Sequence, residues 1–393
     1  MKFNISTTKK RDKTREQAMA IFSSNVKYEV INLIAEGGMG AVYKATKKGV
    51  DGFEKIVAIK TMLDSYTSDK VLVTRFIEEA KLVADLVHEN IVQIYQLDKY
   101  KGNYFFVLEF VDGISLYDFI EFHLQTRKTL PENLAIFITS RIARGLAYAH
   151  TRRGATGQMM NIVHCDVCPH NILITREGLP KLTDFGIVKA KSMTDYTSIS
   201  GKLPFMSPEQ AAGDEIDFRS DIYSLGAVLF YLLTGDSIRD MDEEIKVILK
   251  QAKNNLIQWQ KLPKDTPPEV QDLLGKMLAK NPSERYQSTT ELARDLEYHI
   301  YKSGYGPTIS TLADYMQELM PGKFMNNAAA SQTDDLAHTI PINTDDLAAS
   351  SPIMDEDKTV VLPASYFEGK AHKTENIGKL PRTVIIPDKH FKT

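Results

Sequence analysis

Three polar side chains, spaced at short intervals in one part of the chain, could together support the transfer of a phosphoryl group. Asp166 and Asn171 lie five residues apart, and Asp184 follows after an apolar segment. Carboxylate and amide oxygens are ligands that Mg²⁺ accepts, and a carboxylate can orient an attacking hydroxyl. Phosphoryl transfer needs little else apart from positive charge near the leaving phosphates. These three residues are therefore candidates for a magnesium-dependent site.

A second group of residues, nearer the N-terminus, could supply that positive charge. Gly37, Gly38 and Gly40 lie where a chain without Cβ atoms can close over a polyphosphate and aim backbone N–H groups at it. Such a glycine cluster is also common as a plain hairpin turn. The residues that follow favour the phosphate, because Lys60 ends the segment V-A-I-K and Glu79 comes soon after as a partner for its ammonium.

The elements that must position these residues follow from the hydrophobic pattern. Alternating apolar residues predict strands, and apolar residues at helical spacing predict helices. The predicted strands are residues 28–34, 42–45, 56–62, 91–97 and 104–110, with a short β pair at 172–182. The predicted helices are residues 76–86, 134–149, 221–233, 240–252, 268–279 and 289–301. The pattern predicts an α+β fold in which a sheet with one helix precedes a mainly helical part.

Composition and charge exclude several classes of protein. The 393 residues, 43% of them hydrophobic, predict two or three structural units. A net charge of -3 lacks the basic field that nucleic-acid binding requires, so we expect no nucleic-acid partner. No apolar run reaches the roughly 20 residues that span a bilayer, and the first two dozen residues lack the apolar core of a secretory signal. We therefore expect no membrane partner and a cytoplasmic location.

The motifs, taken in order, resemble those of protein kinases, and specifically the eukaryotic-like (Hanks-type) serine/threonine kinases of bacteria. The resemblance extends from about residue 28 to residue 299. It rests on I-A-E-G-G-M-G-A-V-Y at 34–43, V-A-I-K at 57–60, H-C-D at 164–166, D-F-G at 184–186, S-P-E-Q at 207–210 and D-I-Y-S-L-G at 221–226. It implies a two-lobed fold that binds ATP in the cleft and acts on protein substrates. The alternative, unrelated turns and surface charges, would have to produce all these features in one order.

The resemblance also implies a role for each matching residue, with ATP and Mg²⁺ as cofactors. Asp166 would be the catalytic base, Asn171 and Asp184 would hold Mg²⁺, and Lys60, paired with Glu79, would contact the phosphates. The implied nucleotide contacts are Ile34, Gly37, Gly38, Gly40, Val42, Ala58, Lys60 and Leu173, with the backbone of Glu109 and Val111 bonding adenine and Leu108 as gatekeeper. Glu209 and Arg285 fall where the family keeps a buried ion pair with a structural role.

Four positions depart from the family pattern, namely Ala35, Cys165, Cys168 and Lys202. Cys165 replaces an arginine that would grip a phosphorylated activation loop, so we expect activity to depend only weakly on such phosphorylation. Cys168 replaces a lysine that would neutralise charge on the transferred phosphoryl group. Lys202, in place of a threonine, could supply that cation as part of the catalytic set, and the simpler alternative is an exposed lysine.

These departures leave open an alternative function. The main hypothesis is an active kinase that phosphorylates serine or threonine on proteins, including itself, and the alternative is an ATP-binding pseudokinase scaffold. A kinase for small molecules is disfavoured because S-P-E at 207–209 resembles the segment that presents protein substrates. The serine/threonine assignment rests on that segment and on the G-G-M-G loop, since the usual catalytic-loop lysine is missing.

Cys165 and Cys168 form a C-x-x-C pair around the candidate base. Their oxidation to a disulfide would distort the loop that holds Asp166 and would couple activity to redox state. The simpler alternative is that both are small residues that fill space, with thiols kept protonated by the nearby carboxylate.

The sequence predicts four segments. They are a polar leader at 1–25, a kinase domain at 26–302 (N-lobe to about 111, C-lobe from about 112), a short helical extension at 303–324 and a mostly disordered tail at 325–393. Tail threonines followed by Leu or Ile at the third position are Thr333, Thr339, Thr344, Thr359 and Thr383. This spacing suits phosphothreonine-reading forkhead-associated domains, so the tail could be autophosphorylated bait. Alternatively, residues 360–362 and 384–386 are short β segments that dock on the kinase or pair with another chain.

Overall fold

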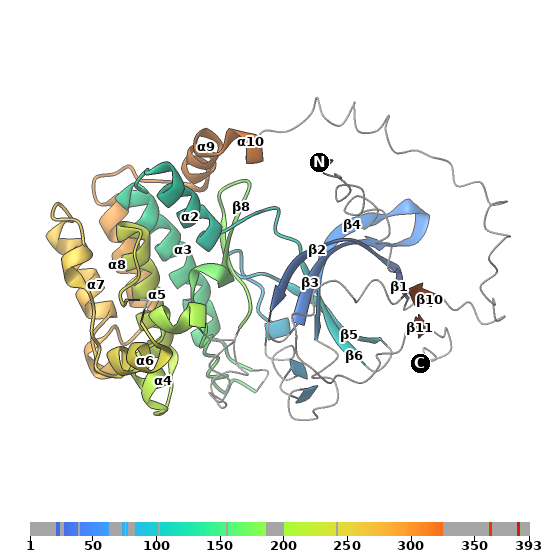
Figure 1. Cartoon of the computed structure of the whole chain (residues 1–393), viewed down its shortest axis with the longest axis horizontal. Helices are drawn as coiled ribbons and strands as arrows, with labels where there is room; N and C mark the ends of the chain where they lie inside the picture. The colour runs from blue at the N-terminus through green and yellow to red at the C-terminus, as the bar shows by residue number, and fades with distance from the viewer. Residues whose placement is uncertain are drawn as a thin grey trace, which may run out of the picture. The chain divides into compact units, whose positions relative to one another are not determined.

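The computed structural model describes residues 21–23, 27–37, 40–62, 73–74, 76–77, 83–100, 103–154, 156–185, 200–240, 243–324, 361–363 and 383–385. The chain divides into two compact units (Figure 1). Unit 1 comprises residues 1–68, 96–110 and 326–393, and unit 2 comprises residues 69–95 and 111–325. Unit 1 is built on a β-sheet, whereas unit 2 is mainly helical.

The sheet of unit 1 has the strand order β1-β2-β3-β4-β6-β5. The strands are β1 (Ile21–Ser23), β2 (Lys27–Gly37), β3 (Gly40–Lys48), β4 (Glu54–Met62), β5 (Ile94–Tyr100) and β6 (Asn103–Glu109). Consecutive strands from β1 to β4 pair antiparallel, as do β4 and β6. The apolar residues predicted to alternate do so, since Val57 and Ile59 of β4 and Val107 of β6 are fully buried in one cluster with Tyr28. The predicted strands at 28–34, 42–45, 56–62 and 104–110 are confirmed to within a few residues.

Unit 2 is built around α3 (Glu132–His150), which packs against α5 (Phe218–Thr234) and α8 (Thr289–Tyr301). Leu146 of α3 and Ile222 of α5 are among its fully buried residues. The remaining helices are α2 (Leu116–Thr126), α4 (Pro208–Ala212), α6 (Ile245–Lys253), α7 (Pro268–Met277), α9 (Ile309–Leu319) and α10 (Pro321–Phe324). Among the described residues, no helix is both long and apolar enough to cross a membrane.

A small antiparallel sheet in unit 2 carries the predicted β pair. It consists of β7 (Gly113–Ser115), β8 (Ile172–Thr175) and β9 (Pro180–Leu182), in that order. Two short 3-10 helices flank functionally important residues: η3 (Pro169–Asn171) leads directly into β8, and η6 (Ser200–Phe205) precedes α4. The small sheet therefore fixes the chain just after Asn171 and just before Asp184.

Three helices differ from the sequence predictions: one begins later than predicted, and two, α2 and α4, were not predicted. The helix predicted to begin at Asp240 begins at Ile245, because Glu244 is still extended and marks the N-terminal cap. The helix α2 was missed, although Ser115 caps it by accepting a hydrogen bond from the N–H of Asp118. An S-x-x-D spacing before an apolar run is a recognised start signal, so this helix could have been predicted.

The helix α9 lies beside α2 (Figure 1) and belongs to the core of unit 2. Leu312 and Met316 of α9 are fully buried. The hydroxyl of Tyr315 lies 2.8 Å from Nε2 of His123 on α2. Gly178, with a φ of 86°, approaches α9 so closely that a Cβ there would lie 2.2 Å from the carbonyl oxygen of Ile309. The turn before β9 and the helix α9 are therefore closely packed.

The two described segments beyond residue 360 are strands that pair with each other. β10 (Val361–Pro363) and β11 (Thr383–Ile385) are antiparallel, with Leu362 opposite Val384. They belong to the two copies of a sequence repeat, K-T-V-V-L-P at 358–363 and R-T-V-I-I-P at 382–387. The prediction of short β segments there is confirmed for these residues, but the pairing joins the two repeats of one chain.

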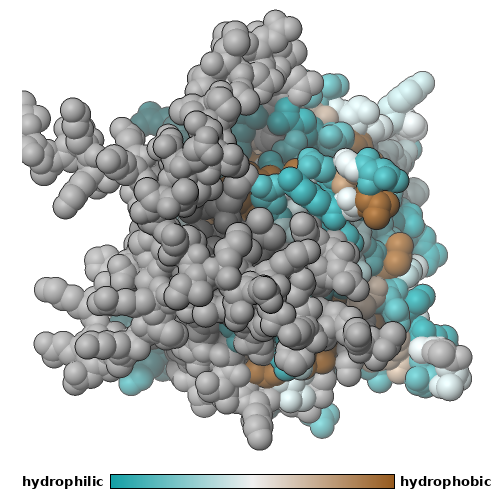
Figure 2. Space-filling view, turned by 90° about the vertical axis from the view of Figure 1, so that its right-hand side faces the viewer, coloured by the Kyte–Doolittle hydropathy of each residue, from teal (hydrophilic) through white to brown (hydrophobic). Residues whose placement is uncertain are grey.

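The described surface seen in Figure 2 is mainly hydrophilic, with apolar residues in separate small patches. Large apolar side chains that are exposed in unit 1 include Leu33 and Ile34 on β2 and Val50 and Phe53 between β3 and β4. Scattered exposed apolar residues of this kind are normal on protein surfaces and do not by themselves indicate a binding site.

Candidate active site

The loop from His164 to Asn171 is irregular, and a buried carboxylate on α5 holds its backbone. Asp221 is 1% exposed, and its two oxygens accept hydrogen bonds from the backbone N–H groups of His164 (2.7 Å) and Cys165 (2.8 Å). Nε2 of His150 lies 2.9 Å from the same carboxylate. Cys165 has a φ of 63°, which is unfavourable for a residue with a side chain. The bond to its N–H therefore offsets the strain that this conformation imposes.

The imidazole of His164 joins the backbone at Asp166 to the backbone at Thr183. It is fully buried, and burial lowers its pKa although Asp221 and other carboxylates oppose that shift. Nε2 lies 3.0 Å from the carbonyl oxygen of Thr183 and must carry the proton, because a carbonyl can only accept. Nδ1 then accepts the N–H of Asp166 at 3.2 Å. One side chain thus links the candidate base to the residue that precedes Asp184.

Asp166 and Asn171 are in direct contact. Nδ2 of Asn171 donates to the backbone oxygen of Asp166 at 2.8 Å and to its carboxylate Oδ2 at 2.9 Å. The backbone N–H of Thr183 donates to the carbonyl of Asn171 at 2.9 Å, which places Asp184 next in the chain to that bond. The structure therefore brings together the three polar residues that the sequence singled out.

The donor atoms of these residues fit a magnesium ion that arrives with a polyphosphate. Both donor hydrogens of the Asn171 amide are used on Asp166, so its oxygen is the atom that remains for a cation. A carboxylate and an amide oxygen, completed by substrate phosphates and waters, are a typical Mg²⁺ set. Among the described residues, no group of three or more His, Cys, Asp or Glu side chains forms a closed metal cage.

In unit 1, strand register places the expected nucleotide-side residues on one face of the sheet. Val42 is opposite Lys60, and Leu108 is opposite Ala58. Paired residues share a face and alternate residues along a strand do too, so all four side chains lie on the same face. Ile59, between Ala58 and Lys60, points to the other face and is fully buried. The register alone thus groups these side chains.

Two glycines of the predicted phosphate segment lie at the end of β2 and at the start of β3. Gly37 is paired with Gly40, and a Cβ on Gly40 would lie only 2.0 Å from the carbonyl oxygen of Thr61 on β4. Gly40 is therefore required by the close approach of two strands, a reason that the sequence did not suggest. Ile34 lies at an irregularity of the pairing and is 48% exposed, while Ala35 is paired with Val42.

For the remaining predicted site residues, the structure gives the element on which each lies. Glu109 lies at the end of β6, Val111 follows in unit 2, and Leu173 lies on β8. Lys202 lies in η6. That its ammonium supplies the cation missing from the catalytic loop stays a prediction. Gly38, Glu79, Gly186 and the activation-loop serines and threonines from 192 to 198 are outside the described residues.

The two cysteines of the C-x-x-C pair are not joined by a disulfide in this structure. Cys168 is 1% exposed and belongs to the main apolar cluster. Burial, reinforced by the charges of Asp221 and Asp166, raises the pKa of the Cys165 thiol. The carboxylates act on this thiol in the expected direction, with burial as the larger cause, and both observations favour a space-filling role.

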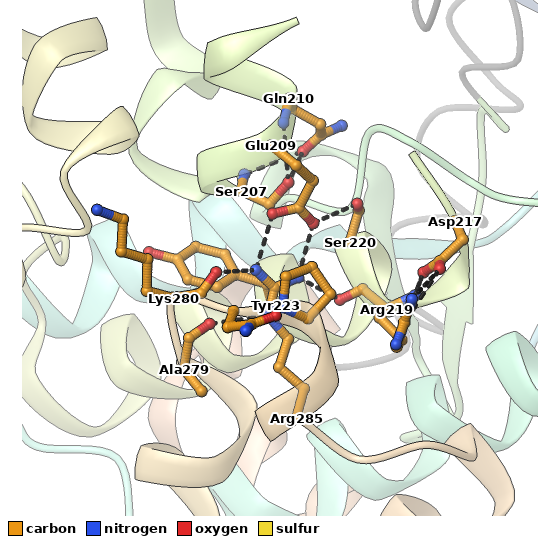
Figure 3. A network of polar contacts seen from close by, with 12 residues as sticks. Ser207, Glu209, Gln210, Asp217, Arg219, Ser220, Tyr223, Ala279, Lys280 and Arg285 are labelled. Atoms are coloured by element: carbon orange, nitrogen blue, oxygen red, sulfur yellow. Dashed lines mark hydrogen bonds and ion pairs between the residues drawn. The ribbon is translucent and has the colours of Figure 1, made fainter. Parts of the chain in front are cut away.

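The predicted ion pair between Glu209 and Arg285 is confirmed (Figure 3). The two terminal nitrogens of the guanidinium donate to the two carboxylate oxygens at 2.6 and 2.8 Å, and the hydroxyl of Ser220 donates to the same carboxylate. Burial alone would raise the pKa of Glu209, but the bonds and charge of Arg285 hold it below its usual value. The pair joins α4 to the segment after η8 (Pro282–Glu284).

Sequence reasoning missed the residues that hold the catalytic loop from a distance. His150 lies 71 residues before Asp221 in the chain, and Gln210 of α4 donates from Nε2 to the carbonyl of Cys165 at 3.0 Å. No local spacing signals such contacts, because helices far apart in sequence meet only in the folded core.

Comparison with known proteins agrees with this arrangement. The family model described as "Protein kinase domain" matches residues 28–297. Serine/threonine-protein kinase PrkC of Bacillus subtilis is 35% identical over 274 residues, which are 69% of this chain and 40% of PrkC. The tyrosine-protein kinase MasK of Myxococcus xanthus is 34% identical over 298 residues, which are 74% of this chain and 46% of MasK. The chain thus spans less than half the length of these relatives.

Among solved structures, the kinase domain of PknI from Mycobacterium tuberculosis is similar with a TM-score of 0.51 and 24% sequence identity. The likeness covers 69% of this chain and 95% of that domain. At this identity it shows the fold alone, a β-rich part followed by a helical part. The fold class that the sequence predicted is confirmed.

Proposed function

Because this chain belongs to the protein kinase family, we propose that it is an active serine/threonine kinase that transfers the γ-phosphate of ATP to protein hydroxyls. One observation carries the proposal: the amide of Asn171 is bonded to the carboxylate of Asp166, and a backbone bond brings Asp184 alongside. A positioned base and two oxygen ligands for Mg²⁺ in one place are what phosphoryl transfer requires of a protein.

In this proposal Asp166 orients the substrate hydroxyl and accepts its proton. The bond from Nδ2 of Asn171 to Oδ2 fixes the rotamer of the carboxylate, and the bond from its N–H to His164 fixes the backbone. Both reduce the freedom that the base would otherwise lose in the transition state. Asn171 and Asp184 would hold Mg²⁺, which when bound neutralises charge on the phosphates.

ATP binding is assigned to the face of the sheet that carries Val42, Ala58 and Lys60. Two small or branched apolar side chains suit an adenine ring, and a lysine on the same face suits its phosphates. Glu79 would pair with Lys60, as the resemblance implies. The backbone groups of Glu109 and Val111 would bond the adenine edge.

Cys168 gives the pseudokinase alternative its support, because no lysine follows the catalytic aspartate. We place the active enzyme first because the base, both metal ligands and the ATP lysine are all present. Lys202, in the segment that precedes α4, is the candidate for the missing cation. Replacing it with threonine should then lower the transfer rate about tenfold, a barrier change of roughly 1.4 kcal/mol.

The tail threonines, notably Thr359 and Thr383, are proposed sites of autophosphorylation that a forkhead-associated domain could read. Each is the second residue of a repeat, directly after a basic residue, and an aliphatic residue follows it three positions later. A phosphate would add roughly two negative charges for an Arg cluster on the partner to bind. Site mapping by mass spectrometry tests this: an active preparation with unmodified tail threonines would exclude it.

The proposed function is tested by measuring, in the presence of Mg²⁺, the transfer of label from γ-labelled ATP to protein by the full chain. We propose that the chain acts in the cytoplasm. The matched pair of variants is Asp184→Ala and Asp272→Ala, the second an exposed aspartate on α7. We expect label with the wild type and with Asp272→Ala but not with Asp184→Ala. Nucleotide binding without any transfer by the wild type would establish the pseudokinase instead.

A further inference from the structure

Arg239 is a buried cation that the proposed mechanism does not use. It follows α5 in unit 2, is 1% exposed, and has one of the largest fully buried side chains. Nη1 donates to the carbonyl oxygens of Leu203 (3.1 Å) and Pro204 (2.8 Å), and Nη2 donates to the hydroxyl of Tyr223 (2.7 Å). Two of its three partners are therefore backbone groups of η6.

The environment of Arg239 differs from that of the other buried arginine nearby. Arg285 has the carboxylate of Glu209, whereas within the described residues no carboxylate lies at ion-pairing distance from Arg239. Its Nε has no hydrogen-bond partner there either, and burial lowers the pKa of the guanidinium. Burying an unpaired charge is costly, so a carbonyl-bound arginine at this place indicates a specific task.

Tyr223 on α5 connects the two arginines. The guanidinium carbon of Arg285 lies 4.9 Å from the ring centroid and that of Arg239 lies 5.7 Å from it. The hydroxyl of Tyr223 donates to Oδ1 of Asn255 at 2.7 Å, and Nδ2 of Asn255 donates to the carbonyl of Leu278 at 3.0 Å. Arg239 is thus fixed on one side to the helical core before it reaches η6 on the other.

The helix η6, to which Arg239 is hydrogen-bonded, precedes residues 207–209, which resemble the substrate-presenting segment of kinases. Beyond Pro204 come Phe205, which is 6% exposed, and then Ser207, which caps α4. Glu209 of α4 is held by Arg285, as Figure 3 shows, so the two arginines fix the chain on either side of residues 205–208. The carbonyl of Leu203 also accepts the backbone N–H of Met206 at 3.3 Å, so Arg239 adds a second donor there as well as bonding the carbonyl of Pro204.

We propose that Arg239 is a positioning residue for the protein substrate: by binding the carbonyls of Leu203 and Pro204 it sets the shape of η6 and thereby the affinity for the acceptor protein. The inference rests on the proposed kinase function. It assigns no chemical step to Arg239, which acts through the backbone of η6. The prediction is a selective loss of protein-substrate affinity that spares the nucleotide.

The test uses the full chain with Arg239→Leu, Arg239→Lys and Tyr223→Phe, and with Arg294→Leu as the control at an exposed arginine of α8. With myelin basic protein as acceptor and saturating MgATP, we expect Arg239→Leu to raise the KM for the acceptor about tenfold, since both charge-assisted bonds to η6 are lost. The KM for ATP should stay within about twofold. Arg239→Lys should recover part of the loss, because an ammonium can still reach a carbonyl.

Hydrogen exchange of the nucleotide-free chain gives a readout that needs no activity. Arg239→Leu should speed exchange in peptides covering residues 200–207 by about tenfold and leave α8 unchanged. If Arg239→Leu fails to unfold cooperatively, Tyr223→Phe, which removes the hydroxyl that accepts from Nη2 and donates to Asn255, should show the same selectivity at about threefold.

Each outcome decides between the proposals. Unchanged exchange at 200–207, or equal rises in the KM for acceptor and for ATP, would overturn the role of Arg239. A wild type that transfers no phosphate would refute the kinase function and the substrate role together. Altered exchange in Arg239→Leu would then still establish the anchoring of η6.

Discussion

The nucleotide-side face of unit 1 and the catalytic loop of unit 2 position their residues by different means. In the sheet, Ala58 and Lys60 share a face because β4 is a regular strand in a continuous ladder. The loop has no strand pairing, and side chains hold it instead. Asn171 bonds to the carboxylate of Asp166, and Asp221 accepts hydrogen bonds from the backbone just before Asp166. A single substitution should therefore disturb the loop far more than the sheet.

The largest effect is expected from Asp166→Asn, which removes the proposed base and leaves its size unchanged. The amide cannot accept the proton of the substrate hydroxyl, so the rate of phosphoryl transfer should fall by roughly 10³-fold. Nucleotide affinity, measured by calorimetry, should not change, because the ATP face belongs to the sheet. A variant that kept more than about a tenth of the wild-type rate would show that Asp166 is not the base.

The second effect is on folding, through Asp221→Asn. The carboxylate accepts bonds from His164, Cys165 and His150, whereas an amide would point a donor at one of those donors. The free energy of unfolding in urea should fall by about 3–5 kcal/mol, as for other broken buried networks. Asp217→Asn, at the half-exposed cap of α5, should cost less than about 1 kcal/mol. Equal costs would contradict the anchoring role.

The third effect is a change in pH dependence at Glu209→Gln. Arg285 holds the pKa of Glu209 below its ordinary value of 4.5 in the folded chain, so the pair stabilises the fold above that pH. The stabilisation is lost as the pH falls through the lowered pKa. Glu209→Gln should therefore be less stable at pH 7, by about 3 kcal/mol, and should lose less stability than the wild type on acidification. Parallel stability curves against pH would contradict this.

The smallest effect is expected in the sheet, from Gly40→Ala. The new Cβ would meet the carbonyl of Thr61, and moving the strands apart should cost about 2 kcal/mol in thermal or urea unfolding. Ala35→Gly, on the partner strand, adds no contact and should cost less than about 1 kcal/mol. If Gly40→Ala were as stable as Ala35→Gly, the glycine would serve only the nucleotide.

The sequence predicted the regular parts of the molecule well, because alternation and helical spacing are local signals. The strands at 28–34 and 56–62 and the long helices around residues 134–149 and 221–233 were found in this way. The grouping of Asp166, Asn171 and Asp184 came from motif order, and the structure confirms that Asp166 and Asn171 touch.

What could not be predicted depends on contacts between distant segments. Arg239 looked like an ordinary charged residue after a helix, yet it is buried against carbonyls 35 and 36 residues earlier in the chain. The requirement for glycine at position 40 likewise comes from β4, whereas the sequence offered only a polyphosphate or a hairpin turn as a reason. Spacing along one segment carries no information about such neighbours.

The proposed serine/threonine kinase activity is tested most directly by identifying the amino acids that the full chain phosphorylates. Wild-type chain and Asp166→Asn would be incubated with γ-labelled ATP and Mg²⁺, and the labelled protein hydrolysed and separated into phosphoserine, phosphothreonine and phosphotyrosine. We expect label on serine and threonine in the wild type and none in Asp166→Asn. Label confined to tyrosine, or equal label in both chains, would contradict it.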